Sequence, residues 1–541
     1  MRTRRLDGWA VATLVTAFLV AGPLLGLPLS FVVGSGHSFT HFSGFLPDAV
    51  RNTILLVLGV GTGTLVLGTG LALLVSFCDF PGRSWIEWAL VLPLAVPGYV
   101  FTLFALGTLP AGGTAIRSPL GAIVIFTLVL YPYVYLLGRA AFLSQSQALL
   151  EAARGLGLSS ARAIFKVAVP LARPAILGGT ALALMEALAD FGTVNLLGVH
   201  TFTDAIYRVW FIAFDRQAAM QLAALLVTVT LALLVLERLA RGRARYHQLA
   251  AKGDAISAIR LKGVGAVAAT LGPLALVGAV VAAPLGQLSV WALRSIRHGS
   301  LAPEFATQAR NSLLLAFMSA FLVTGVALLL AYGLRGSRSR LTEAAVRVAT
   351  IGYGVPGSVV AVAVIVPLGW LDHRIDGGSS SLFGSDPGLV LTGTVIGLFV
   401  AYVVRFLALA FQAVDTSLLR IPGHLDEAAQ GLGADRLDVL ARIHVPLMRA
   451  GLATGALLVF TEVMKELPAT LLLRPLGGDT LAIAVWQATS ESLFQTAALP
   501  ALLIVLVGLL PVALMIRLSG RPAATVQPPE VPEPQPLAAT I

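Results

Sequence analysis

The chain has 541 residues, of which 57% are hydrophobic and only 12% charged, with a formal net charge of +10. A soluble globular chain carries about 25% charged residues, so this composition excludes an ordinary soluble domain. The single cysteine, Cys78, excludes an internal disulfide and a cysteine metal cluster. The basic excess lies mainly in alternate loops without a nucleic-acid-binding motif, so no nucleic acid is expected as a partner.

Long apolar runs divide the chain from one end to the other. A run of about 20 apolar residues is long enough to cross a bilayer as a helix, and these runs lack the alternation of barrel strands. We therefore expect an all-α polytopic membrane protein with about twelve transmembrane helices. The runs cover residues 9–33, 52–78, 85–110, 119–143, 174–198, 219–237, 263–291, 311–333, 345–371, 388–412, 450–473 and 496–516.

The basic residues predict the orientation of these helices. The first run follows "MRTRR" and has the flanking charge of a signal peptide, but it is long for one and no cleavage site follows, so we expect an uncleaved helix. With this end in the cytoplasm, the Lys- and Arg-rich segments all fall on the cytoplasmic side, as the positive-inside rule requires. We expect a multi-pass protein with cytoplasmic N- and C-termini. The basic segments are 154–166, 238–262, 335–340 and 436–442, and the poorer loops are 34–50, 199–218 and 372–387.

The sequence repeats itself. "RNTILLV" at 51 matches "RNSLLLA" at 310, and "VPG" at 96 matches "VPG" at 355, both at an offset of 259 residues. Later landmarks match at an offset of 276, so 17 extra residues, the difference between 276 and 259, entered the second copy. We expect them in the loop at 372–388 and in the run before Glu427. Parallel repeats of six helices usually have a transport pathway between them, and we expect one here. The alternative is a duplication whose halves share no pathway.

Two polar stretches interrupt the apolar pattern at matching places. "EAARGLG" begins at residue 151 and "EAAQGLG" at 427, and each is followed nineteen residues after its glutamate by a proline, Pro170 or Pro446. The glycine at the end of each motif is suited to positive φ and the end of a helix. Ser159 and Asp435 then favour N-caps for a second helix, which we expect the proline to stop. Such an exposed helix-turn-helix suits a protein partner, although it also suits a connector that packs only on its own chain.

The pattern E-A-A-x3-G-x9-I/V-x-V-P resembles the cytoplasmic EAA loop of binding-protein-dependent ABC importer permeases, and the resemblance covers essentially the whole chain. It implies the ABC importer permease (MetI-like) fold in a bacterial inner membrane. In that family the loop is a coupling helix that docks in a groove of an ATPase subunit. Val167 stands where the family has isoleucine, and V-P stands in both copies where L-P is frequent. The implied ATPase-docking residues are Glu151, Ala152, Ala153, Gly157, Glu427, Ala428, Ala429 and Gly433.

The resemblance also implies the partners. One fused chain with two loops would meet two copies of a cytoplasmic ABC ATPase subunit, and a periplasmic or lipoprotein substrate-binding protein would deliver the cargo. The sequence contains no phosphate-binding G-x-x-x-x-G-K-[ST] motif, and neither G-x-S-x-G nor H-E-x-x-H. We therefore expect a transport subunit that is not an enzyme and carries no cofactor of its own, with ATP hydrolysis on a separate chain.

Ionisable residues stand inside the apolar run that follows each loop. Glu186 matches Glu462 and Asp190 matches Glu466 at the offset of 276, and Lys465 belongs to the second copy alone. Each acidic pair is spaced i, i+4 on one helix face, and charges at such depth usually face a cavity or one another. We expect either a net acidic translocation pathway or an ion-pair network between the halves, for instance Lys465 with Asp190. Gly192 and Pro468 predict a break in each helix, and each V-P-G predicts a bend near a gate or close helix packing.

The segments "ADFGTVNLLG" and "VMKELPATLLLRP" resemble those of the ferric-iron branch of the family, which makes Fe(III) the expected substrate. The alternatives are thiamine, polyamine, sulfate or phosphonate, carried by the same kind of permease. An ion-coupled secondary transporter, using the intramembrane carboxylates as ion sites, is a further alternative that leaves the twin loops unexplained. The expected parts are a first permease half, 1–240, with its EAA loop at 144–172; a cytoplasmic linker, 241–262; a second half, 263–520, with its loop at 413–448; and a disordered cytoplasmic tail, 521–541.

Overall fold

The computed structural model describes residues 8–32, 44, 46–241, 259–299, 303–337, 339–383 and 388–519. Most of the expected linker and the whole expected C-terminal tail lie outside these residues. The described part is almost entirely helical, and its one sheet is a parallel pair of two-residue strands, β1 (Cys78–Asp79) and β2 (Ile259–Arg260). The prediction of an all-α membrane protein is confirmed.

The first half runs from α1 to α11, and the helices form where the apolar runs were predicted. Long apolar helices alternate with short ones at the turns and breaks. Their bounds are α1 Gly8–Gly26, α2 Leu46–Phe77, α3 Arg83–Ala89, α4 Gly98–Thr108, α5 Pro119–Leu143, α6 Gln147–Gly155, α7 Ser160–Ala163, α8 Val169–Ala189, α9 Gly192–Leu196, α10 Phe202–Phe211 and α11 Arg216–Arg241.

The second half repeats this order from α12 to α24. Its bounds are α12 Gly263–Val277, α13 Ala283–Arg297, α14 Phe305–Gly336, α15 Arg340–Ala349, α16 Gly357–Phe383, α17 Val395–Leu419, α18 His424–Gly431, α19 Arg436–Val439, α20 Val445–Leu447, α21 Arg449–Met464, α22 Pro468–Leu473, α23 Leu481–Ser490 and α24 Phe494–Ser519.

Ten helical stretches among the described residues are long and apolar enough to cross a membrane, or up to twelve if each of two bent pairs is one span. The expected single span at 85–110 is one of the bent pairs: its two parts, 83–95 and 98–108, meet at 89°. The expected span at 345–371 is likewise divided, since α15 ends at Ala349 and α16 begins at Gly357. Both divisions fall at the V-P-G motifs, because proline removes a helical donor and restricts the residue before it.

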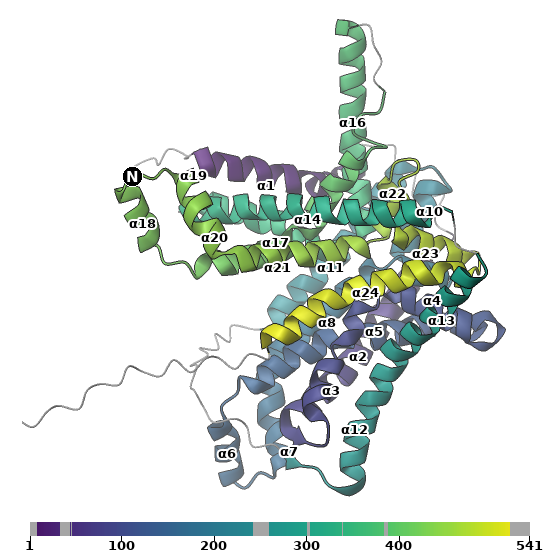
Figure 1. Cartoon of the computed structure of the whole chain (residues 1–541), viewed down its shortest axis with the longest axis vertical. Coiled ribbons are helices and arrows are strands. Elements are labelled where there is room, and N and C mark those ends of the chain that lie inside the picture. Colours follow the sequence, from purple (N-terminus) through teal and green to yellow (C-terminus); the bar gives the residue numbers. More distant parts are fainter. Residues whose placement is uncertain are drawn as a thin grey trace, which may run out of the picture.

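The helix lengths locate the 17 extra residues of the second half. α4 has 11 residues and α16 has 27, whereas α5 and α17 both have 25 and already stand at the offset of 276. The insertion therefore lies entirely before α17. The expectation that part of it lies in the run directly before Glu427 is wrong, because that run follows the start of α17. α16 projects well beyond the other helices (Figure 1).

Helices of each half pack against the other half. α1 packs on α14, α15 and α16 of the second half, and α12 packs on α3 of the first. The closing helix α24 packs on α13 and α23, and also reaches α4. Figure 1 shows two groups of long helices, one around α14, α17 and α21 and one around α2, α5 and α8. Both short loop helices, α6 and α18, lie at the same side of the molecule; we call this side the loop end, and the side of α10 and α23 the opposite end.

Candidate functional site

The first of the two polar loops forms an exposed hairpin of helices. α6 carries Glu151 and Ala152 on its exposed face, whereas Ala153 is only 8% exposed and packs inward. The helix ends in the turn predicted for it: Gly157 has φ of 89°, its N–H donates to Arg154, and the N–H of Leu158 donates to the carbonyl of Ala153. This pair of bonds is a Schellman motif, which satisfies the carbonyls at the end of the helix.

The second loop repeats this geometry bond for bond. Glu427 and Ala428 are exposed on α18, Ala429 is 9% exposed, and Gly433 has φ of 89°. The N–H of Gly433 donates to Gln430, and that of Ala434 donates to Ala429. The two motifs therefore place glutamate, alanine and glycine in the same relative positions in both halves.

The second helix of each hairpin starts at the predicted cap. The side chain of Ser159 accepts from the N–H of Arg162 at 3.4 Å, and that of Asp435 accepts from Asp438 at 2.7 Å. Because an oxygen at this position satisfies an otherwise unpaired N–H, the cap fixes where the helix begins. Serine and aspartate therefore cap equivalent helices in the two halves.

The expectation that proline stops this second helix is wrong in the first half. Pro170 stands at the start of α8, directly after a π-helical turn at Ile164–Ala168, and the helix continues from Ser160 to Ala189. A π-turn shifts the hydrogen-bond ladder by one residue and so absorbs the missing donor of proline. In the second half the same π-turn occurs, Leu440–His444, but the helix bends by 76° just after Leu447.

Each hairpin also displays a leucine that the sequence analysis did not single out. Leu156 is 87% exposed and Leu432 is 90% exposed, and both directly precede the glycine of the turn. Exposed leucines are ordinary singly, but two at equivalent positions of a repeat indicate a shared contact surface. The available signal was an apolar residue in the middle of each polar stretch.

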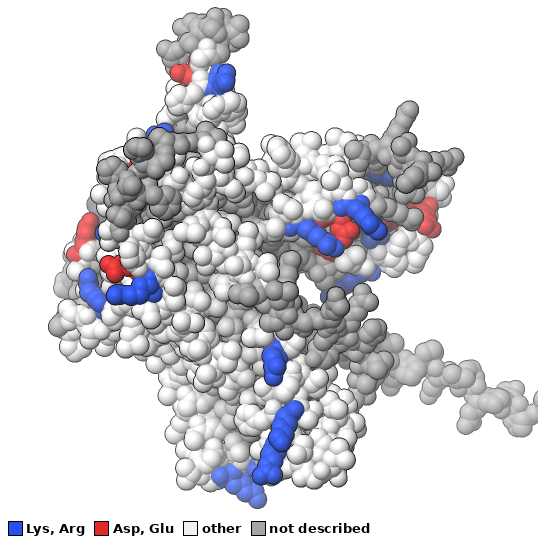
Figure 2. All heavy atoms as spheres, turned by 180° about the vertical axis from the view of Figure 1, so that it is seen from behind, with Lys and Arg blue, Asp and Glu red and all other residues white. Residues whose placement is uncertain are grey.

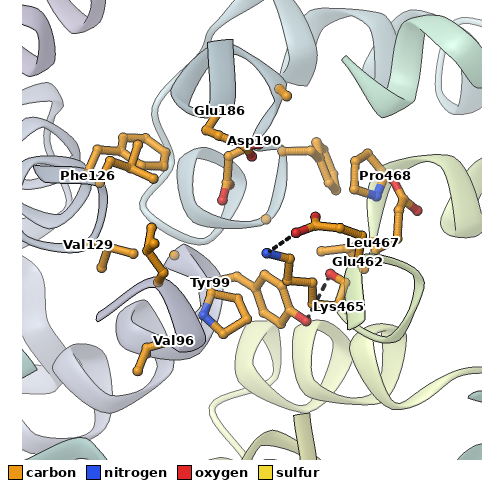
Figure 3. A pocket seen from close by; sticks show the side chains of 18 of the residues that line it. Val96, Tyr99, Phe126, Val129, Glu186, Asp190, Glu462, Lys465, Leu467 and Pro468 are labelled. Carbon is orange, nitrogen blue, oxygen red and sulfur yellow. Dashed lines mark hydrogen bonds and ion pairs between the residues drawn. The ribbon is translucent and has the colours of Figure 1, made fainter. Parts of the chain in front are cut away.

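A central cavity of about 100 Å³ lies between the two halves. The start of α4 together with α5, α8 and α9 line it from the first half, and α17, α21 and the start of α22 line it from the second. Figure 3 shows the acidic and basic side chains converging on it. All five residues expected in a pathway line this cavity: Glu186, Asp190, Glu462, Lys465 and Glu466.

Two of these carboxylates cap the helices that begin at the predicted breaks. Asp190 accepts from the N–H of Thr193 at 2.7 Å and from its hydroxyl at 3.0 Å. Glu466 accepts from the N–H groups of Ala469 and Thr470 at 3.1 and 2.9 Å. α9 and α22 thus begin beside these carboxylates. Asp190 and Glu466 are consequently held by backbone donors, and the break in each helix is confirmed.

Two ion pairs of the cavity lie within the second half. Lys465 binds Glu462 at 2.8 Å, so the expected pairing of Lys465 with Asp190 is not the one observed. Arg405 of α17 binds Glu466 at 3.2 Å, with side chains that are 13% and 1% exposed. Arg405 was missed, although an arginine inside the apolar run "AYVVRFLALAF" is itself a signal. The cavity therefore has four carboxylates and two cations, not one cation as expected.

The V-P-G glycines make room for the capping carboxylates. A Cβ added at Gly98 would lie 2.6 Å from Oγ1 of Thr193 and 2.9 Å from Oδ2 of Asp190. A Cβ at Gly357 would collide with Arg405 and Glu466 in the same way. In both halves, then, the first residue of the helix after V-P is a glycine on which the break of another helix packs directly.

A third glycine brings the two halves together. A Cβ at Gly192 would lie 2.8 Å from both Cδ2 of Leu467, in the other half, and Cβ of Tyr99. The hydroxyl of Tyr99 in turn donates to the carbonyl of Lys465 at 3.3 Å. The broken segments of the two halves therefore meet at the cavity.

The cavity carboxylates are not arranged as a metal-binding cluster. Within the described ranges, no group of three or more His, Cys, Asp or Glu residues is positioned to hold a metal ion. The cavity holds two ion pairs and further carboxylates at a contact between the halves, beside the two broken helices. Such an arrangement suits a route that opens and closes better than a permanent binding site.

Comparison with protein families gives a match over both halves. The model of the binding-protein-dependent transport system inner membrane component matches residues 64–241 and again residues 323–522. Each match contains one of the two loops and the broken helix that follows it. The repeat found in the sequence is therefore a repeat of this one family unit.

Three relatives illustrate the range of similarity. A Fe(3+)-transport system permease protein of Haemophilus influenzae, FbpB 2, is 27% identical over 87% of this chain and 90% of its own length. A molybdate/tungstate transport system permease protein of Thermococcus kodakarensis, WtpB, is 24% identical over 37% of this chain and 80% of its own length. A putative 2-aminoethylphosphonate transport system permease protein of Salmonella choleraesuis, PhnU, is 28% identical over 42% of this chain and 92% of its own length.

Proposed function

The chain belongs to the family of binding-protein-dependent transport system inner membrane components, and on this premise we propose that it imports ferric iron with the help of separate ATPase subunits. As a family member it is a multi-pass inner-membrane permease of an ABC importer. The observation that carries the proposal is the recurrence of the loop hairpin, with its Schellman turn, exposed glutamate and exposed leucine, once in each half.

Two copies of an ABC ATPase would dock on the two hairpins. Glu151, Ala152 and Gly157 of α6 and its turn would enter a groove of one copy, with Leu156 as an apolar anchor. Glu427, Ala428, Gly433 and Leu432 would do the same with the other copy. The small alanines allow close approach, while Ala153 and Ala429 face inward and close the turn. The loop end would then face the cytoplasm, as would both termini.

Transport would proceed by alternating access. Closure of the ATPase pair would draw α6 and α18 together, and the halves would separate at the opposite end, where a binding protein delivers its cargo. The broken helices at Asp190 and Glu466 suit this motion because a segment can pivot at a break while its cap holds the helix start. ATP hydrolysis would reset the loops. The linker 241–262 and the tail 521–541 would remain on the cytoplasmic side.

Ferric iron is favoured as cargo because the relative named for Fe(3+) transport aligns over nearly the whole chain, whereas those named for molybdate and for phosphonate align over less than half of it. The cavity is compatible with a cation, since its carboxylates outnumber its cations. Both of its cations are already paired with carboxylates, however, so the binding protein would make most of the selection.

ATP-driven uptake by the reconstituted complex of permease, ATPase and binding protein tests this assignment. Proteoliposomes are offered ferric citrate, molybdate or 2-aminoethylphosphonate, each as a radiolabelled solute. Iron uptake that needs ATP and the binding protein supports the proposal. Uptake of one of the other solutes without iron keeps the permease and rejects the substrate.

An ion-coupled secondary transporter is the alternative that the cavity carboxylates favour. It would move solute down an imposed proton or sodium gradient without any ATPase, using Glu186 or Glu462 as the ion site. The same vesicles decide: gradient-driven uptake in the absence of ATPase would support this alternative.

A further inference from the structure

The two loop hairpins are attached to the membrane helices by different means. The second helix of the first hairpin continues directly into a membrane helix, because the chain is helical from Ser160 to Ala189 without a sharp break. The second does not, because its helix, 436–447, meets α21 at 76° beside Met448. Figure 1 shows α19 and α20 lying across the direction of α14, α17 and α21. A force on the second hairpin therefore cannot pass along a straight helix into α21.

A largely buried polar cluster connects the second hairpin to the membrane helices instead. Asp426 of α18 receives Nε of Arg335 on its Oδ2 at 2.9 Å, and its Oδ1 lies 2.7 Å from Nε2 of His444. His444 is completely buried, and Arg335 and Asp426 have side chains 19% and 23% exposed. We call Arg335, Asp426 and His444 the loop clamp.

The loop clamp reaches two long membrane helices. Arg335 lies in the last turn of α14, and its two terminal nitrogens donate to the carbonyls of Leu418 and Ile421, at 2.8 and 3.0 Å, where α17 ends. Tyr332, one turn earlier on α14, donates to the carbonyl of Arg436 at 2.7 Å and so also holds α19. One arginine therefore joins α14, the end of α17 and the second docking helix. Paired charges with several hydrogen bonds hold geometry well.

The first half has apolar or small residues at the matching positions. At the offset of 276, Leu150 stands for Asp426 and Ala168 for His444; at 259, Ser76 stands for Arg335 and Leu73 for Tyr332. Leu150 packs in an apolar cluster with Phe77, Phe142 and Ala163. The clamp therefore belongs to the second half alone, and it occurs in the half whose helix is bent.

We propose that Arg335, Asp426 and His444 are positioning residues that carry the motion of the second docking helix into α14 and α17, whereas the first docking helix acts on α8 through α7, the second helix of its hairpin, which continues into α8. This inference rests on the proposed docking of an ATPase, but the spin-label test of the clamp needs no ATPase. The two hairpins present the same docking motif and transmit its movement along different routes.

Spin labels at equivalent positions of the two docking helices test the clamp. Arg154 and Gln430 match at the offset of 276 and are both exposed. Each is replaced by cysteine in a Cys78→Ser background, and the labelled full chain is studied in lipid nanodiscs without ATPase. Asp426→Asn removes the charge at constant shape. It is expected to shift the spectrum at position 430 toward faster motion and to leave that at position 154 unchanged.

The matched control is Ser76→Ala, at the first-half position equivalent to Arg335, which is expected to change neither spectrum. Asp426→Glu, which keeps the carboxylate, should restore most of the slow motion at position 430. If Asp426→Asn does not fold, Tyr332→Phe removes one bond of the same attachment and should give a smaller shift at the same position. An unchanged spectrum at 430, or an equal shift at 154, overturns the proposal.

Co-purification separates this inference from the proposed function. The Asp426→Asn chain should still bind the ATPase, because its docking face is intact, but should move less solute per ATP hydrolysed. Wild-type solute movement per ATP in that variant overturns the clamp and leaves the docking proposal standing. Failure of the unaltered chain to bind any ATPase removes the docking proposal, while the spin-label result still decides whether the clamp holds α18.

Discussion

The indole Nε1 of Trp486 donates a hydrogen bond to Oδ1 of Asn195, 3.0 Å away, and so joins the second half of the chain to the first. The amide nitrogen of Asn195 donates in turn to the buried carboxylate of Asp204 at 2.9 Å. The rings of Phe191 and Tyr207 pack around Trp486, with centroids 5.8 and 6.1 Å away. Because Phe191 also lines the central cavity, this contact holds the halves together beside the cavity, toward the opposite end.

Removing that hydrogen bond should weaken the contact. Trp486→Phe keeps an aromatic ring but leaves Oδ1 of Asn195 without the indole donor, at a cost of about 1 kcal/mol. We expect the midpoint of thermal unfolding of the purified chain to fall accordingly. Trp210→Phe, at the equivalent position of the first half, is the control. If Trp486→Phe leaves the unfolding midpoint unchanged, the packing of the rings and not the hydrogen bond to Asn195 stabilises this contact.

Alanine at the V-P-G glycines should be costly. Gly98→Ala places a methyl group against Thr193 and Asp190, and Gly357→Ala places one against Arg405 and Glu466. Overpacking of this kind costs about 1–3 kcal/mol of folding free energy. Gly70→Ala is the control, because a Cβ there meets nothing within 4 Å and alanine favours a helix. Thermal unfolding in detergent decides; Gly98→Ala as stable as Gly70→Ala contradicts the close approach.

The pair Arg405–Glu466 should show strong coupling between its members. Glu466→Gln or Arg405→Met alone leaves one charge buried without its partner, which costs about 3–5 kcal/mol in a buried pair. The double variant removes both charges and should recover most of that loss, apart from the cap that Glu466 supplies to α22. A double-mutant cycle on unfolding measures the coupling. Additive losses would mean that the two residues act independently.

The Asp426 carboxylate of the loop clamp should stay ionised near neutral pH. Burial opposes ionisation of Asp426, but hydrogen bonds from Arg335 and His444 outweigh it, and the pKa of this carboxyl lies below its ordinary value of 3.8. A carboxyl with a lowered pKa stabilises the fold fully above its ordinary pKa and loses that effect as the pH falls through the lowered value.

The spin label at position 430 should therefore keep its slow motion between about pH 8 and pH 5, and gain mobility only in stronger acid. The control is the label at position 154, because the first hairpin has Leu150 where the second has Asp426. Mobility that rises at position 430 between about pH 7 and pH 5 would contradict control of this attachment by the Asp426 carboxylate.

Much of this arrangement follows from local sequence. The turns at Gly157 and Gly433, the caps at Ser159 and Asp435 and the breaks before Gly192 and Pro468 were all predictable, because each depends on residues within one helical turn of it. The repeat supports each of these features with a second copy. The acidic residues line the shared cavity as expected, although Asp190 and Glu466 lie just beyond the ends of α8 and α21 and not on a helix face.

Contacts between distant helices were not predictable in the same way. The pairing of Arg405 with Glu466 depends on the register between α17 and α21, and the fit of Gly98 against Asp190 on that between α4 and α8. The prediction that the helix stops at Pro170 was wrong for a local reason that hydrophobic periodicity does not reveal. A π-turn just before the proline accommodates its missing N–H, and the helix continues. Leu156 and Leu432 were overlooked because their exposure is a property of the folded hairpin.

The number of ATPase copies bound by the purified chain tests the central claim most directly. Native mass spectrometry would compare the wild type with Glu151→Lys, Glu427→Lys and the double variant, and Ser159→Ala would serve as a control on the fold of the hairpin. We predict two ATPase copies on the wild type, one on each single variant and none on the double variant. Two copies on every variant, or no ATPase on the wild type, would contradict the assignment of the two hairpins as docking sites.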